Sequence, residues 1–178
     1  MPDSNILAFF FSTVAAIVAT LTGLIGAFAT FKLQKLESKL DFLKDYTLHK
    51  ELDETKTLNS RIREHRYTSI RKIYVHNKAA IEELKSCIAE LDYHNHTQEY
   101  EYDLENIANF QNQYDGIRKH SRNEFAKSLV FVVLCLIGLL FTNTILQYGF
   151  WWLIIVAYFG GLIYIFSIFI QQIKLLMT

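Results

Sequence analysis

The sequence has few residues that end helices and few that could cross-link a small fold. Its 178 residues contain one proline, at position 2, seven glycines and two cysteines. Because proline and glycine are the strongest breaks in a helix, their scarcity predicts an almost wholly helical protein. Two cysteines, one of which (Cys135) lies in an apolar run, argue against a disulfide framework and against a cysteine metal cluster.

The chain also lacks net charge, with 18 basic and 18 acidic residues. No field of the whole protein therefore favours nucleic acid. Charge is missing locally as well, because residues 4–31 and 128–170 contain none and nearly every charge lies in 32–127. The composition predicts three zones: a transmembrane helix at 1–31, a cytosolic helical domain at 32–127, and a transmembrane hairpin with a short tail at 128–178.

The first uncharged run, Ser4 to Phe31, is long enough to cross a membrane. A bilayer core of about 30 Å needs roughly 20 apolar residues in a helix. A signal peptide would be shorter and would begin with basic residues, although Ala27-Phe28-Ala29 resembles a cleavage motif. We therefore expect a retained membrane helix.

This helix carries two further patterns. Small residues recur at every fourth position in the apolar run, which predicts a face for close packing between subunits in lipid. Leucines then recur at alternating spacings of three and four among lysines, so the helix is expected to continue past Phe31. The leucine stripe has two interpretations: a contact between subunits, or packing on the chain's own helices. The expected packing residues are Ala15, Ala19, Gly23, Ala27, Leu33, Leu36, Leu40 and Leu43.

The charged zone predicts a small bundle of three or four helical elements. Residues 45–65 indicate a surface helix that is broken near Asn59-Ser60. An apolar stripe indicates a helix over 67–91, residues 92–97 have loop composition, and a further stripe begins at Asp103.

The last zone predicts two more membrane helices, at 128–147 and 150–170, which Tyr148-Gly149 joins into a tight hairpin. The predicted fold is thus an all-α membrane protein with a long N-terminal transmembrane helix, a cytosolic helical bundle and a C-terminal transmembrane hairpin.

Basic residues near the spans predict the orientation. Lysines follow the first and third spans and a basic cluster precedes the second, whereas residues 1–5 and 147–150 have no basic residue. By the positive-inside rule, the helical domain and the C-terminus are cytoplasmic and the N-terminus is outside. The basic flanks are also suited to contact anionic lipid headgroups.

One short motif points to chemistry. Arg71 and His76 have the Arg-x4-His spacing of HEPN domains, helical bundles that include many ribonucleases. An arginine can stabilise phosphate charge and a histidine can move a proton, as cleavage of RNA requires. Lys72 departs from the uncharged polar or acidic residue that many HEPN ribonucleases have after the arginine.

Together with the membrane plan, this motif resembles the small transmembrane accessory protein encoded beside the RNA-guided ribonuclease of type VI-B CRISPR systems. The resemblance implies a HEPN-like bundle and a ring-like homo-oligomer in the bacterial inner membrane. It also implies a pore that strengthens antiviral defence by depolarising the cell after the partner ribonuclease cuts viral RNA. Arg71 and His76 alone carry over, in a structural or regulatory role more than a catalytic one.

Other candidate sites are weaker. His94 and His96 lie among acidic residues, but the pattern of metal ligands is incomplete, so we expect neither a metal nor a cofactor. The tyrosines at 93, 100 and 102 also lie among acids, which does not favour stacking on RNA.

We therefore expect an oligomeric membrane pore or permeability effector, because the chain has three spans, a small-residue face and no charge within the spans. Two alternatives stay open: a membrane-anchored HEPN-type ribonuclease, and a membrane scaffold or sensor for a cytosolic partner.

Overall fold

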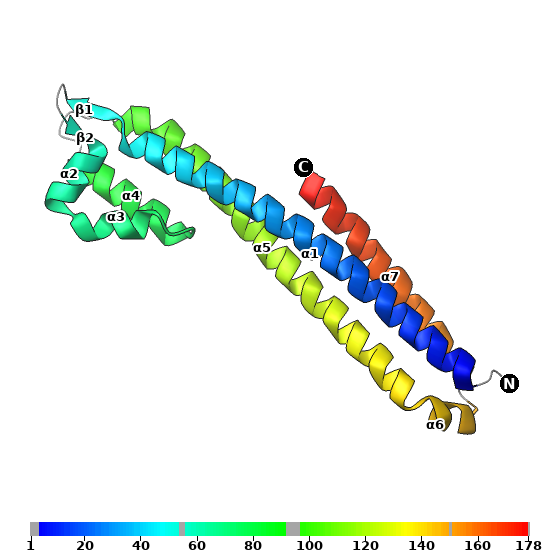
Figure 1. Ribbon diagram of the computed structural model, residues 1–178. Helices are drawn as coiled ribbons and strands as arrows, with labels where there is room; N and C mark the ends of the chain where they lie inside the picture. Colours follow the sequence, from blue (N-terminus) through cyan, green and yellow to red (C-terminus); the bar gives the residue numbers. More distant parts are fainter. Residues whose placement is uncertain (1–3, 54–55, 92–96, 150, 178) are drawn as a thin grey trace. The chain divides into compact units, whose positions relative to one another are not determined.

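The computed structural model describes residues 4–53, 56–91, 97–149 and 151–177, and within them the protein is helical apart from one short β-ribbon (Figure 1). This confirms the predicted helical fold. The helices are α1 (Ser4–Leu48), α2 (Leu58–His65), α3 (Tyr67–Ile73), α4 (Lys78–Leu91), α5 (Thr97–Leu140), α6 (Thr142–Gln147) and α7 (Trp151–Met177). The ribbon pairs β1 (Glu51–Asp53) with β2 (Lys56–Thr57) in antiparallel fashion.

Within the described ranges, three helices are long and apolar enough to span a membrane: α1, α5 and α7. Only 28%, 22% and 17% of their most apolar windows are buried in the protein. Helices this apolar on all sides would be unstable in water, so they need lipid or other subunits around them. The prediction of three candidate spans is confirmed.

The chain divides into two compact units. The apolar unit comprises residues 1–31 and 117–178, and the polar unit comprises residues 32–116. Both boundaries fall inside helices, because α1 runs for 45 residues and α5 for 44. The expectation that the first helix continues past Phe31 is confirmed. The predicted stripe from Asp103 and the start of the predicted second span also belong to one helix, α5.

The apolar unit is held together by contacts among α1, α5 and α7, which lie side by side (Figure 1). Val18 and Ile25 of α1 pack with Ile165 and Phe169 of α7, and Phe131 of α5 packs against them. Nearer the N-terminus, a second cluster forms around Val14, Ala15 and Cys135. The Tyr158 ring joins this region, because its centroid lies 4.9 Å from that of Phe11 and its hydroxyl donates to the carbonyl of Leu134.

The predicted hairpin helix 128–147 is divided in the structure, since α5 ends at Leu140 and α6 begins at Thr142. The Thr142 hydroxyl donates to the carbonyls of Gly138 and Leu139, a local bond that competes with the regular helical ladder. After α6 the chain turns at Gly149, whose φ of 73° lies in the left-handed region that glycine adopts without steric cost. Phe150, the first residue of the predicted third span, lies outside the described residues.

The polar unit corrects two predicted helices. The helix expected over 45–65 is interrupted by the β-ribbon, not near Asn59-Ser60, because α2 begins at Leu58 and the Thr57 side chain caps it at the amide of Ser60. The helix expected over 67–91 is divided into α3 and α4. The Asn77 side chain accepts a hydrogen bond from the amide of Ala80 and so caps α4. Residues 92–96 of the predicted loop lie outside the described residues, and Thr97 already belongs to α5.

Candidate functional site

The Arg-x4-His motif falls on the α3–α4 segment, but its two side chains have different surroundings. Arg71 lies on α3 and is exposed, and within the described part of the chain it makes no hydrogen bond or ion pair. His76 lies between α3 and α4 and is half-buried. Its Nε2 is 3.0 Å from Oδ1 of Asp41, and its ring centroid is 6.0 Å from that of Tyr114. His76 is therefore engaged with α1 and α5, while Arg71 faces outward.

Three acidic residues of α1 form a row at positions i, i+4 and i+8. Glu37 accepts a hydrogen bond from the Tyr114 hydroxyl at 2.7 Å, Asp41 contacts His76, and Asp45 accepts a hydrogen bond from the Tyr74 hydroxyl. Each acid thus binds a group from a different part of the polar unit. Burial and the bond to Asp45 raise the pKa of Tyr74 to about 12.

A lysine lies within the same surface of α1. Lys44 is 1% exposed, and its Nζ donates to the backbone carbonyl of Val75 at 3.0 Å. Burial lowers the pKa of Lys44, and the nearby charge of Asp41 opposes that shift. Asp41, Lys44 and Asp45 therefore fix the α3–α4 connection, which carries His76, against α1.

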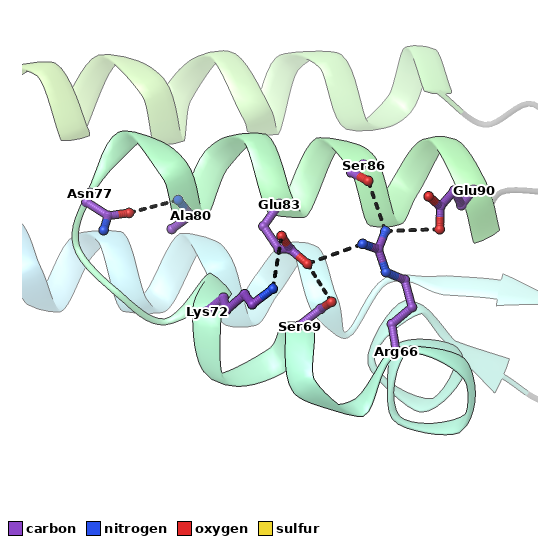
Figure 2. A network of polar contacts seen from close by, with 8 residues as sticks. All are labelled: Arg66, Ser69, Lys72, Asn77, Ala80, Glu83, Ser86 and Glu90. Carbon is purple, nitrogen blue, oxygen red and sulfur yellow. Dashed lines mark hydrogen bonds and ion pairs between the residues drawn. The ribbon is translucent and has the colours of Figure 1, made fainter.

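The most extensive polar network of this region centres on Arg66, which precedes α3 (Figure 2). Its guanidinium lies 3.3 Å from Glu83, 3.0 Å from Glu90 and 2.9 Å from the Ser86 hydroxyl, all on α4. Ser69 donates to Glu83 at 2.5 Å, and Lys72 lies 3.8 Å from the same carboxylate. The hydrogen bond from Ser69 and the charges of Lys72 and Arg66 hold the pKa of Glu83 below its ordinary value.

Sequence reasoning singled out Arg71 and missed Arg66. The signal that could have identified Arg66 is the spacing of acceptors on α4. Glu83, Ser86 and Glu90 follow one another at intervals of three and four residues, so one side of α4 offers three acceptors to a single guanidinium. The network joins α3 to α4 and orders the segment in which His76 lies.

In this region the ionisable side chains contact one another in pairs or small networks. Among the described residues, no group of three or more His, Cys, Asp and Glu side chains is arranged to hold a metal ion. Asp92, His94 and His96, which the sequence offered as incomplete metal ligands, lie outside the described residues. The two cysteines, Cys87 and Cys135, are buried thiols.

The predicted packing residues of α1 separate into two classes. Ala15 is buried against Val14 and Cys135, whereas Ala19, Gly23 and Ala27 are exposed. A Cβ placed on Gly23 would meet no atom within 4 Å. Of the leucines, Leu36 and Leu40 are buried within the protein, and Leu33 and Leu43 are half-buried.

The exposed small residues belong to a wider surface of α1, which we call the small-residue face: Ser12, Ala16, Ala19, Thr20, Gly23, Ala27 and Thr30. Its three hydroxyls donate to backbone carbonyls of the same helix, at Phe9, Ala16 and Gly26. The face therefore presents small side chains whose hydroxyl protons are already bonded, as close packing in lipid requires.

Comparison with known proteins gave no relative: no family model, no curated protein and no solved structure matches this chain.

Proposed function

We propose that this protein is a homo-oligomeric, pore-like effector of the bacterial inner membrane. It enhances RNA-guided CRISPR antiviral defence by permeabilising and depolarising the membrane. The observation that carries the proposal is the small-residue face of α1, which is exposed in a single chain although it lies in one of the three apolar candidate spans.

Exposure of small residues is informative in a membrane. Lipid gains little by covering alanine and glycine, whereas another helix can approach closely and gain van der Waals contact along its whole length. Gly23 has open space where a side chain would go, so a neighbouring helix can approach closely at this position. In the proposed ring, α1 of each subunit packs through this face against a neighbouring subunit.

The expected conduction path is narrow and apolar. Polar groups on the exposed surface of the spans are few, and the hydroxyl of Thr20 is bonded to its own backbone. A path lined in this way conducts when it is wetted and closes when it dries, so that no charged selectivity ring is needed.

The polar unit supplies the cytoplasmic part of this proposal. We infer that it is a divergent HEPN-like bundle, with the C-terminus also cytoplasmic and the N-terminus outside. In it His76 has a structural role, because its imidazole is committed to Asp41. Signalling from the RNA-guided ribonuclease of the system would act on this unit.

The test compares two glycines on exposed helix surfaces. Gly23 of α1 and Gly160 of α7 both have open space where a side chain would go. Gly23→Leu is expected to dissociate the oligomer in cross-linking experiments and to abolish ion leak from proteoliposomes. Gly160→Leu, the matched control, is expected to leave both unchanged.

A Gly23→Leu protein that assembles and leaks like the parent would refute the pore assembly. The link to CRISPR defence has its own measurement: the membrane potential of bacteria that carry the effector ribonuclease, with and without this protein, during phage infection. A potential that falls equally in both strains would refute the proposed role in defence.

A further inference from the structure

A buried acidic residue lies inside the apolar unit, four residues before the uncharged run that begins at Ser128. Glu124 of α5 is 7% exposed. It lines a small cavity with Thr22, Ile25, Gly26 and Ala29 of α1, Ser121, Phe125 and Ser128 of α5, and Phe169 of α7. The α1 residues belong to the uncharged run that ends at Phe31. At 1.5 Å per residue, Ala29 and Thr22 lie about 3 and 14 Å before that end.

The two oxygens of this carboxylate are in different situations. Oε1 accepts a hydrogen bond from Lys127 at 2.8 Å. Oε2 is buried and has no hydrogen-bond partner among the described residues. A buried carboxylate oxygen that lacks a donor costs free energy, so a species that supplies positive charge is favoured at this position.

The other polar groups of the cavity point to the same chemistry. Ser121, Glu124 and Ser128 follow one another at three and four residues, so their oxygens share one face of α5. On α1, the Thr22 hydroxyl donates its proton to the carbonyl of Val18 at 2.7 Å, which leaves only oxygen lone pairs to face other groups. The few polar side chains of this mostly apolar lining are a carboxylate and three hydroxyls, and oxygen groups of this kind suit a hard cation.

Size and charge narrow the class of cation. The cavity measures about 20 Å³, and on the same measure one water needs roughly 10–15 Å³. Hydrated Mg²⁺ is too large for it, and Ca²⁺ takes six to eight oxygen ligands, often several carboxylates. Glu124 is the single carboxylate of the lining and already pairs with Lys127. We propose that this cavity binds one dehydrated monovalent cation of the size of Na⁺, between Glu124 Oε2 and the hydroxyls of Ser121, Ser128 and Thr22.

Binding there would tie α5 to α1 and α7 at one end of the three-helix packing. A ligand that binds only the folded state raises the melting temperature in a saturable manner. This consequence requires neither assembly nor conduction, so the inference stands or falls apart from the proposed pore.

The experiment measures the melting temperature of the purified full-length protein in detergent. NaCl is exchanged for N-methyl-D-glucamine chloride at constant ionic strength, because that organic cation is too large for the cavity. A thiol-reactive dye reports unfolding through the buried Cys87 and Cys135. We expect the melting temperature to rise with Na⁺ concentration and then to level off. KCl and MgCl₂ are tested in the same way. A response to K⁺ as well as Na⁺ supports a monovalent site, and a response to Mg²⁺ alone overturns it.

Two variants locate the effect. Glu124→Gln should abolish the response to Na⁺, while Glu82→Gln, in an exposed pair with Lys85 of the same i, i+3 spacing, should retain it. Ser128→Ala removes one proposed ligand and leaves the hydrogen bond between Lys127 and Glu124 in place. It should fold and lose the response, while Ser12→Ala, which removes a hydroxyl of α1 outside the lining, should keep it.

Equal melting temperatures in Na⁺ and in N-methyl-D-glucamine would show that the cavity holds water only and would overturn the proposal. A full Na⁺ response in the Ser128→Ala protein would also overturn it, even if Glu124→Gln failed to fold.

Discussion

The Nε2 atom of His76 lies 3.0 Å from Oδ1 of Asp41, so the histidine of the Arg-x4-His motif is held by the polar half of α1. Arg71, the other member of the motif, is exposed on α3. A catalytic pair would need both side chains to converge on one substrate phosphate. Here one side chain contributes to packing between elements and the other faces outward.

This difference predicts unequal effects of two substitutions. His76→Ala removes the contact with Asp41 and should lower the free energy of unfolding by about 0.5–1.5 kcal/mol. Arg71→Ala removes an exposed side chain and should change it by less than about 0.5 kcal/mol. Chemical denaturation of the two variants checks this. If both variants kept full stability and both lost a ribonuclease activity of the parent, the catalytic alternative would be correct.

The Arg66 network gives a second prediction. Arg66→Lys keeps the positive charge but loses the planar fork that reaches Glu83, Ser86 and Glu90 together. Because part of the network is open to solvent, we expect a loss of about 1–2 kcal/mol in unfolding free energy. Lys85→Arg, at an exposed pair on the same helix, is the control and should be neutral. Equal stabilities of the Arg66→Lys protein and the parent would show that a single charge suffices.

The sequence predicted the three candidate spans well because the relevant signals, length and apolar composition, can be read along the chain. Length, apolar composition and the absence of charge define α1, α5 and α7 without reference to the rest of the fold. The lack of breaks after Phe31 likewise predicted the continuation of α1. By contrast, the β-ribbon at 51–57 interrupts a charged segment that has no strand-like alternation, so only the folded context reveals it.

Glu124 shows why the polar sites were harder to predict. It lies between Arg122 and Lys127 and therefore looks like part of a solvated basic flank. The buried face of α5 passes through Gln111, Tyr114, Ile117 and then Glu124, so that the acid occupies a core position. Helical periodicity extended across the boundary at residues 116 and 117 could have identified it, whereas composition alone could not.

A third prediction concerns pH. The hydrogen bond from Ser69 and the charges of Lys72 and Arg66 hold the pKa of Glu83 below its ordinary value of 4.5. The folded protein therefore binds this proton less readily than the unfolded chain. The stability that results is present above pH 4.5 and is lost as the pH falls through the lower pKa of the folded state.

Denaturation curves measured from pH 7 downward should show this loss in the parent, and Glu83→Gln should remove part of the dependence. Glu82→Gln, an exposed neighbour on the same helix, should leave the profile unchanged. A parent-like pH profile in the Glu83→Gln protein would assign the acid sensitivity to other groups.

The last prediction uses two adjacent glycines of α7. A Cβ at Gly161 would overlap the ring of Phe131 on α5, whereas a Cβ at Gly160 would meet nothing within 4 Å. Gly161→Ala should therefore force Phe131 from its packed position and destabilise the apolar unit by about 1–3 kcal/mol. Gly160→Ala should be neutral or stabilising by about 0.5–1 kcal/mol, because alanine favours a helix more than glycine does.

The measurement is thermal unfolding of both variants in the same detergent. Since the two sites are consecutive in the same helix and differ in whether they face α5, opposite signs isolate the contact between α5 and α7. Equal shifts for the two variants would mean that helix propensity alone governs this segment and that the contact with Phe131 contributes nothing measurable.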